Sequence, residues 1–258
     1  LLAYSGCLGQ LINYFGIDQG GVHIKTDQPA IAAVNGIALE GDIHDEVVAL
    51  VARGNNLAAA SRGLARMAGR HVPAWMAQAD AAAAAIRPHF RTVLAERKDD
   101  ATPVTLADRA AEEAMRRILT AEVPRDSIIG EEFGSTAGTS GRSWVLDPID
   151  GTAGFLAGRP IFGTLIALVV DGWPVLGVID QPILGERWLG AAGQGTTFNG
   201  KPVHGAPCRE LSDAVLATTS PHLFSEHDGE HYLALAAAVG SPLYGGDCYN
   251  YALLASGH

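Results

Sequence analysis

Residues 144–155 have the sequence Trp144-Val-Leu-Asp147-Pro-Ile-Asp150-Gly-Thr-Ala-Gly-Phe155. An apolar, strand-like run ends in an acid, and a second acid follows three residues later. Pro148 favours extended dihedrals at the residue before it, while Gly151 permits the sharp turn that brings the second acid back toward the first. The two carboxylates are therefore expected to reach the same small volume.

The oxygen atoms in this stretch suit a hard metal ion. Cations such as Mg²⁺ prefer carboxylate, carbonyl and water oxygens, so Asp147, Asp150 and the carbonyl of Ile149 form a suitable ligand set. Thr152 opens the next segment, where backbone N–H groups without partners would meet a phosphate. The stretch therefore predicts a combined metal and phosphate site.

The same residues resemble the signature of the inositol-monophosphatase-like family of Mg²⁺-dependent sugar phosphatases, in which an apolar strand runs into Asp-Pro-x-Asp-Gly-Thr. Upstream, Gly130-Glu131-Glu132 resembles the strand-end Gly-Glu-Glu of that family. The segment from Lys98 to Thr105-Leu-Ala-Asp108 resembles its Thr-x-x-Asp segment.

The resemblance continues downstream, where residues 245–257 are similar to the version found in the histidinol-phosphate phosphatase branch. It covers the chain from about residue 72 onward, so we expect a phosphatase domain over 71–258 and an unassigned, fused or foreign segment over 1–70. The family's last metal acid lies on a later Trp/Tyr-Asp segment that this sequence does not contain. The resemblance therefore implies a fold shortened at its C-terminal end, with greatly reduced turnover for residues 1–258.

The periodicity indicates alternating helices and strands, which is typical of an α/β layered sandwich; the family fold has the layer order α-β-α-β-α. We expect helices from Pro73, from Thr105 and from Cys248, together with one over 230–239. Strands are expected over 127–130 and 143–146, and over several later segments arranged as adjacent antiparallel neighbours, while 134–141 is expected to be a loop.

Composition restricts the class of partner. The formal net charge is −10 and there is no Lys/Arg cluster, which argues against nucleic acid and anionic membranes. Three cysteines, Cys7, Cys208 and Cys248, are an odd number without metal-site spacing, so a cytoplasmic location is expected. The expected partner is a small phosphomonoester, and the family resemblance implies a homodimer.

The resemblance implies hydrolysis of a phosphomonoester by water, assisted by two or three Mg²⁺ ions. Glu131, Asp147 and the Ile149 carbonyl would hold the first ion, and Asp147 and Asp150 would reach toward the second. Glu131 and Thr152 would orient the attacking water. The N–H groups of Gly151 and Thr152 would receive phosphate oxygens.

Two acids have an additional structural interpretation. Asp108 is expected either to cap the helix that begins at Thr105 or to face the water network of the metal site as well. Asp247 would suit a cationic amine better than a polyol, which favours histidinol phosphate, but it is also expected to cap the helix that follows. Inositol 1-phosphate is the alternative substrate, and a non-catalytic phosphate-binding protein is the alternative of another class.

Overall fold

A computed structural model describes residues 75–92, 96–97, 103–170, 173–191 and 194–258. Its helices are a first one over 75–86, α4 (Leu106–Glu122), α5 (Thr152–Leu156), α6 (Glu226–Ala238) and α7 (Asp247–Ala255), with 3₁₀ turns η1 (Arg87–His89), η2 (Leu211–Asp213) and η3 (Pro221–Leu223). Its strands are β1 (Glu96–Arg97), β2 (Pro103–Val104), β3 (Ser127–Gly130), β4 (Gly134–Thr136), β5 (Arg142–Asp150), β6 (Gly163–Val170), β7 (Trp173–Gln181), β8 (Glu186–Ala191), β9 (Gly195–Phe198), β10 (Lys201–Val203), β11 (Val215–Thr218) and β12 (Ser241–Tyr244). The expected segment over 1–70 and Lys98 lie outside the described residues.

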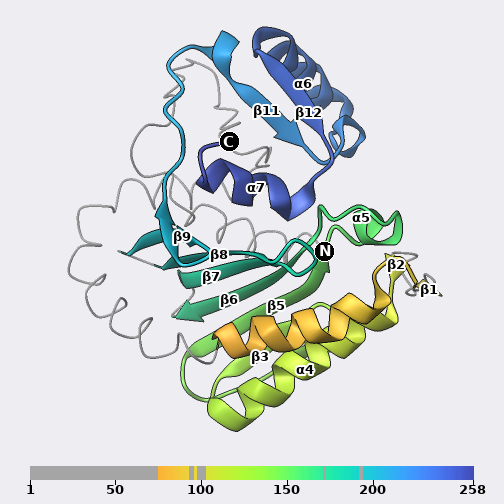
Figure 1. Ribbon diagram of the computed structural model, residues 1–258, viewed down its shortest axis with the longest axis vertical. Helices are drawn as coiled ribbons and strands as arrows, with labels where there is room; N and C mark the ends of the chain where they lie inside the picture. Colours follow the sequence, from red (N-terminus) through yellow and green to blue (C-terminus); the bar gives the residue numbers. More distant parts are fainter. Residues whose placement is uncertain (1–74, 93–95, 98–102, 171–172, 192–193) are drawn as a thin grey trace.

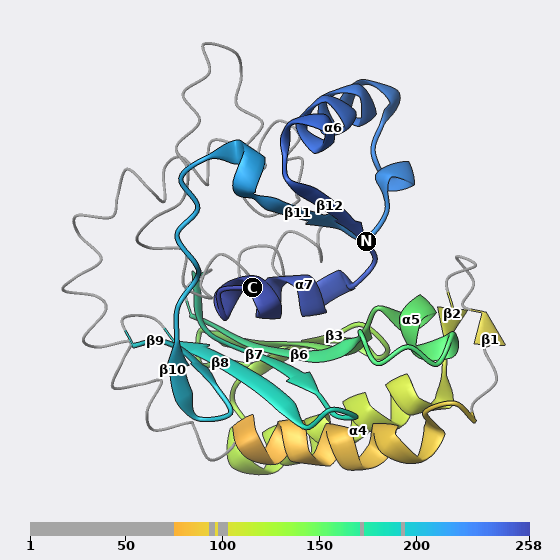
Figure 2. The same ribbon diagram turned by 45° about the horizontal axis from the view of Figure 1, so that its top comes forward.

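The elements form the predicted layers in the order α-β-α-β-α. Figures 1 and 2 show the helix over 75–86 and α4 under the large sheet, α7 on its other face, then the β11–β12 pair and finally α6. The layered α/β fold class is therefore confirmed. Each sheet face is covered by a helix, which is how a two-faced apolar sheet avoids water.

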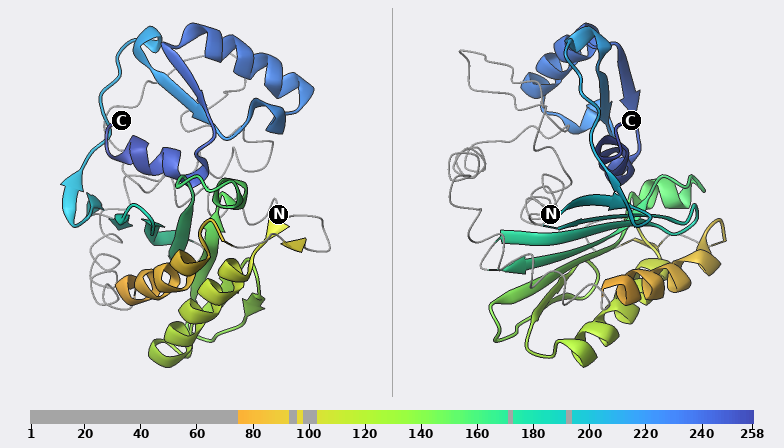
Figure 3. Two further views of the ribbon diagram at one scale, coloured as in Figure 1. Left: turned by 45° about the vertical axis from the view of Figure 1, so that its right-hand side comes forward. Right: turned by 60° about the vertical axis from the view of Figure 1, so that its left-hand side comes forward.

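The large sheet has eight strands in the order β10-β9-β8-β7-β6-β5-β3-β4. The neighbours β3 and β5 run parallel, and the other neighbouring pairs that the structure describes in this sheet run antiparallel. From β5 to β10, strands that are neighbours in the sheet are also consecutive in the sequence, as the spacing of the turns predicted. Figure 3 shows the sheet from two further sides. Because β3 and β5 are parallel and Gly130 is paired with Leu146, the residue that follows β3 lies beside Asp147 near the end of β5.

The face of the sheet under α4 holds the larger core. Trp75 and Ile86 from the first helix and Met115 from α4 are fully buried against Trp144 of β5. The two tryptophan rings meet edge to face with centroids 5.8 Å apart, a favourable aromatic geometry. This packing fixes the direction of β5, and therefore the place where its last residues end.

The opposite face is covered by α7. Ala252 and Ala255 pack against Trp188 and Ile179, and the indole N–H of Trp188 donates to Ser256 Oγ at 2.6 Å. Small residues on α7 allow its backbone to come close to the sheet. The C-terminal half of this helix is thus tied to β7 and β8.

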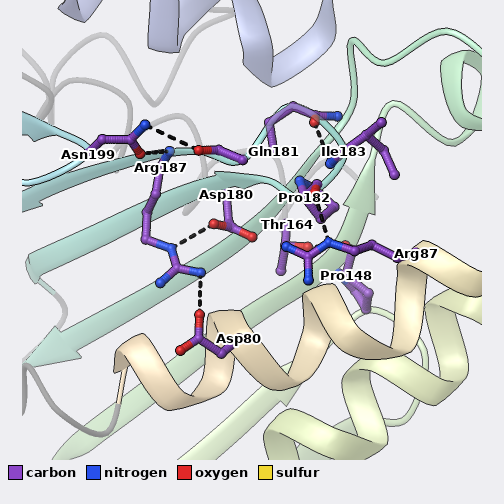
Figure 4. Close-up of polar contacts among 11 residues, drawn as sticks. Asp80, Arg87, Pro148, Thr164, Asp180, Gln181, Pro182, Ile183, Arg187 and Asn199 are labelled. Atoms are coloured by element: carbon purple, nitrogen blue, oxygen red, sulfur yellow. Dashed lines mark hydrogen bonds and ion pairs between the residues drawn. The ribbon is translucent and has the colours of Figure 1, made fainter.

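A charged side chain ties the first helix to the strands above it. Arg187 on β8 donates through Nε to Asp180 at 2.6 Å and through Nη2 to Asp80 at 2.8 Å (Figure 4). In η1, which follows directly after this helix, Arg87 donates to the carbonyl of Pro182 at 2.9 Å. These bonds hold the helix against the end of β7.

Three sequence expectations were wrong in detail. The strand expected over 143–146 runs on to Asp150, because Asp150 pairs with Gly163 of β6 beyond an irregularity at Pro148, whose carbonyl accepts from Thr164 Oγ1. The loop expected over 134–141 begins with β4, which pairs with β3. The helix expected over 230–239 begins earlier, where Ser225 accepts a bond from the Asp228 N–H.

A buried acid at the start of β3 joins three segments. Asp126 accepts from both Arg142 Nε and Nη2, from Ser140 Oγ at 2.6 Å and from Trp144 Nε1 at 3.0 Å. Burial raises the pKa of Asp126, but the bonds from Arg142, Ser140 and Trp144 outweigh it and hold the pKa below its usual value. The charged form of this acid therefore stabilises the fold.

We predict that Asp126→Asn lowers the free energy of unfolding at pH 7 by about 1–3 kcal/mol, because it leaves buried donors without a charged acceptor. A depressed folded pKa stabilises the protein above the unfolded value and loses its effect as pH falls. Urea denaturation should therefore show a deficit that shrinks below about pH 4. The exposed Asp213→Asn is the control, and equal midpoints for the two variants at pH 7 would contradict the prediction.

Candidate functional site

The strand register brings the first predicted pair of acids together. Gly130 of β3 is paired with Leu146 of β5 in the parallel ladder, so Glu131 and Asp147 are the next residues on two adjacent strands. The N–H of Glu131 continues the ladder by donating to the Leu146 carbonyl at 3.2 Å. Adjacent strands lie about 4.8 Å apart, so the backbones of these two acids are close neighbours.

The second predicted acid is turned back beside the first. The register of β5 against β6 is irregular between Asp147 and Asp150, where Pro148 interrupts the ladder. Gly151 then adopts a left-handed φ of 86° and serves as the N-cap of α5. The turn that the glycine was expected to permit is present.

The electrostatics of Asp147 show that the acids share one environment. Asp147 is 7% exposed, and its Oδ1 has no hydrogen-bond partner in the part of the chain that the structure describes. Burial raises the pKa of Asp147 well above its usual value, and the carboxylates of Asp150, Glu131 and Asp108 raise it further. A buried oxygen surrounded by like charges is an unfavourable arrangement that a cation would relieve.

Asp150 is hydrogen-bonded to α7, the helix on the other face of the large sheet from α4. The N–H of Cys248, at the start of α7, donates to Asp150 Oδ2 at 2.7 Å. Burial raises the pKa of Asp150 to about 6, with the Cys248 bonds lowering it and the charges of Asp247 and Glu131 raising it. The sequence alone did not predict this hydrogen bond, because its two partners are 98 residues apart.

Asp108 caps the start of α4, as the first of its two interpretations predicted. Its Oδ2 accepts from the Thr105 N–H at 2.9 Å and from Thr105 Oγ1 at 2.6 Å, which completes a capping box at the start of α4. Burial raises the pKa of Asp108 to about 6, and the charges of Glu132 and Glu131 add to the rise. The capping role is confirmed, and the carboxylate also lies in the field of the candidate site.

Asp247 lies beside the motif glycine. A Cβ placed on Gly151 would come within 2.9 Å of Asp247 Oδ2, so this carboxylate borders the turn after Asp150. The expectation that Asp247 caps α7 was wrong: Gly246 is the N-cap and no side-chain cap bond is present there. Asp247 is instead the first residue of the helix, with a left-handed φ of 41°.

Thr152 and Ile149 lie across the same turn. Thr152 Oγ1 donates to the Ile149 carbonyl at 3.0 Å, which leaves the lone pairs of the hydroxyl for another donor. The carbonyl keeps one further acceptor position. Both groups thus retain the oxygen lone pairs that their expected roles need.

The donor set fits a hard divalent cation by its chemistry. It consists of the carboxylates of Glu131, Asp147 and Asp150 and the carbonyl of Ile149, which are all oxygen donors. Within the described ranges, however, no group of three or more His, Cys, Asp or Glu side chains has the spacing of a closed ligand set.

Sequence reasoning missed two acids with buried side chains beside Glu131. Glu112 on α4 is fully buried and accepts from the backbone N–H of Glu132 at 2.7 Å and of Phe133 at 3.2 Å. Glu132, expected only as the second member of an acidic pair, has a side chain that is 3% exposed, with Arg109 Nε 4.0 Å away. The available signal was the spacing of Glu112 to Arg116, but this i,i+4 pattern also occurs on exposed helix faces.

Comparison with known proteins assigns the chain to a family. The sequence model of the inositol monophosphatase family matches residues 71–258. The chain belongs to the inositol monophosphatase family, as the motif around residues 147–152 predicted. The family match covers every carboxylate described above.

The chain is similar to several named relatives. It is 52% identical over 184 residues to the chloroplastic bifunctional phosphatase IMPL2 of Arabidopsis thaliana, which covers 70% of this chain and 53% of that protein. It is 41% identical over 161 residues to a histidinol-phosphatase of Chlorobaculum parvum, covering 62% of each. The chain thus spans between about half and two thirds of the length of these relatives.

Solved structures support the same fold. An inositol monophosphatase from Zymomonas mobilis is 50% identical with a TM-score of 0.64, covering 73% of this chain and 74% of that one. The extragenic suppressor protein suhB from Bartonella henselae is 30% identical with a TM-score of 0.67, covering 72% and 74%. Among the helices described here, none combines the length and apolar composition that crossing a bilayer requires.

The clustered acids predict an unusual pH dependence for the metal-free protein. The pKa values of Asp108 and Asp150, about 6 in the fold, exceed the unfolded values near 4, so the folded state binds more protons between them. Stability in the presence of a chelator should therefore fall as pH rises from about 4 to 6.

We predict that Asp150→Asn raises the free energy of unfolding at pH 7.5 in chelator by about 1–3 kcal/mol, because it removes a repelled charge and keeps an oxygen for the Cys248 N–H. Chemical denaturation at pH 4.5 should show a smaller gain. Asp126→Asn serves as the contrasting variant, since it should destabilise. A lower midpoint for Asp150→Asn at pH 7.5 would contradict this account.

Proposed function

We propose that the protein hydrolyses a phosphate monoester with the help of bound Mg²⁺, and that histidinol phosphate is its substrate. The observation that carries the proposal is the gathering of Glu131, Asp147 and Asp150 at the ends of β3 and β5, with one buried oxygen of Asp147 lacking a partner. Three carboxylates without a cation would repel a phosphate, since two like charges about 5 Å apart repel by roughly 3 kcal/mol at an effective dielectric of 20.

The residues divide the work between holding ions and holding substrate. Glu131, Asp147 and the Ile149 carbonyl would hold one ion, and Asp147 with Asp150 a second. The chemistry supplied by bound Mg²⁺ is neutralisation of the phosphate charge and activation of a water at neutral pH. The protein needs to supply little covalent chemistry for phosphoryl transfer, because positioning and charge neutralisation account for most of the acceleration.

Substrate and water would be positioned by the turn after Asp150. The Thr152 hydroxyl donates to Ile149, so its oxygen can accept a hydrogen bond from a water that Glu131 also orients. The N–H groups of Gly151 and Thr152 would receive phosphate oxygens. Asp108 would act on the same water network from the start of α4, where it shares the field of Glu131.

Asp247 supports histidinol phosphate as the substrate. Its carboxylate borders Gly151, next to the proposed phosphate position, and a carboxylate favours a cationic amine over a neutral polyol. Relatives named histidinol-phosphatase, at 38–41% identity, support the same choice. Inositol 1-phosphate is the second candidate, because the Zymomonas mobilis protein at 50% identity is an inositol monophosphatase.

We predict that the longest natural polypeptide containing this chain releases phosphate from histidinol phosphate with Mg²⁺ and loses this activity in chelator. Asp147→Asn should lower kcat by about 10³-fold or more, since it removes an oxygen donor worth several kcal/mol in the transition state. Phosphate release measured over a Mg²⁺ series is the assay, with the exposed Glu113→Gln as control. Activity that chelator leaves unchanged would contradict the mechanism.

For specificity, we predict that Asp247→Asn raises KM for histidinol phosphate roughly tenfold, because one charge-assisted hydrogen bond is lost. The KM for inositol 1-phosphate should change less than about threefold, since a polyol carries no cation for this carboxylate. Steady-state kinetics with both esters at saturating Mg²⁺ measures the ratio. An equal change for the two esters would show that Asp247 does not select the amine.

A further inference from the structure

The turn that carries Glu131 is anchored by a carboxylate from below. Glu112 on α4 is 0% exposed, and its two oxygens accept from the backbone N–H groups of Glu132, at 2.7 Å, and Phe133, at 3.2 Å. Backbone donors in a tight turn have no partner in the turn itself. Glu112 therefore supplies the acceptors that the β3–β4 turn lacks.

The residue before Glu131 is a glycine for a related reason. A Cβ built on Gly130 would lie 1.9 Å from Glu112 Oε1, a distance that no real side chain could adopt. The carboxylate thus occupies the space that any larger residue at position 130 would need. A larger residue at position 130 would therefore displace the Glu112 carboxylate from the turn.

Arg116 balances the buried charge and extends the anchor. Its Nε donates to Glu112 Oε1 at 2.7 Å, one Nη donates to Thr136 Oγ1 at 3.1 Å, and the other donates to the Gly134 carbonyl. A buried carboxylate is tolerated only when it is paired and hydrogen-bonded, and these contacts provide both. Together the two side chains hold the turn from Glu132 to the start of β4.

A second Glu–Arg pair, one position further along α4, provides an internal comparison. Glu113 and Arg117 have the same i,i+4 spacing, but their closest atoms are 3.4 Å apart and their side chains are 63% and 68% exposed. The corresponding exposures of Glu112 and Arg116 are 0% and 16%. An exposed ion pair contributes little to stability. Of the two pairs, the buried one is hydrogen-bonded to the β3–β4 turn.

We propose that Glu112, paired with Arg116, is a positioning residue that fixes the backbone of Glu131 and thereby sets the approach of its carboxylate to Asp147. On one side Glu131 is tied to Leu146 through its own N–H, and on the other side the following N–H is tied to Glu112. The inference rests on the proposed function, because it concerns the same Mg²⁺-dependent site. It adds an outer contact that fixes the orientation of a proposed ligand.

Glu112→Gln and Glu113→Gln test this inference as a matched pair. Loss of an outer-shell partner commonly costs at least about tenfold in metal affinity, so Glu112→Gln should raise the Mg²⁺ concentration for half-maximal phosphate release about tenfold. KM for the ester at saturating Mg²⁺ should stay within about twofold, since Glu112 does not contact the proposed substrate position. Glu113→Gln should match the wild type in both quantities.

A second measurement needs no activity. Amide hydrogen exchange in chelator should be at least about tenfold faster at Glu132 and Phe133 in Glu112→Gln, and unchanged in Glu113→Gln. If Glu112→Gln does not fold, Arg116→Lys replaces it, because lysine keeps the charge but cannot reach Thr136 and Gly134 together. The expected shift in the Mg²⁺ requirement is then about threefold.

The outcomes separate the two proposals. A wild type that shows no Mg²⁺-dependent phosphate release contradicts the proposed function. A wild type with that activity, and a folded Glu112→Gln with the same Mg²⁺ requirement as Glu113→Gln, overturns the positioning role alone. Faster exchange together with an unchanged Mg²⁺ requirement would also overturn it, because Glu112 would then support only the structure of the turn.

Discussion

The parallel pairing of β3 with β5 is the constraint on which the candidate site depends. It places Gly130 opposite Leu146, so the next residues, Glu131 and Asp147, meet at one edge of the sheet. A slip of one residue would turn every side chain of β3 to the other face and separate the two acids. The tryptophan contact under β5 and the Asp126 network at the start of β3 both oppose such a slip.

The acids gathered at this edge would not remain there without support from several layers. Burial and mutual repulsion raise the pKa of Asp147, which means that the fold holds a charge distribution it would otherwise avoid. The surrounding packing must therefore stabilise the site from both faces. Carboxyl groups whose pKa is raised by burial and by neighbouring charges occur often at functional sites.

Sequence reasoning predicted the features that depend on local chemistry. The turn at Gly151, the capping box of Asp108 and the layered fold all follow from short-range patterns and from the family resemblance. Contacts made across the fold were not predictable in this way. The spacing of Glu112 to Arg116 is the same as that of Glu113 to Arg117, and only packing decides which pair is buried.

The bond from the Cys248 N–H to Asp150 has a consequence for the order of synthesis. Its partners are separated by 98 residues, so a nascent polypeptide displays the acid-rich motif well before the helix that restrains Asp150 leaves the ribosome. During that interval the motif carries unrestrained negative charge on an unfinished sheet. The final position of the Asp150 side chain should therefore be set late, once α7 docks on the sheet.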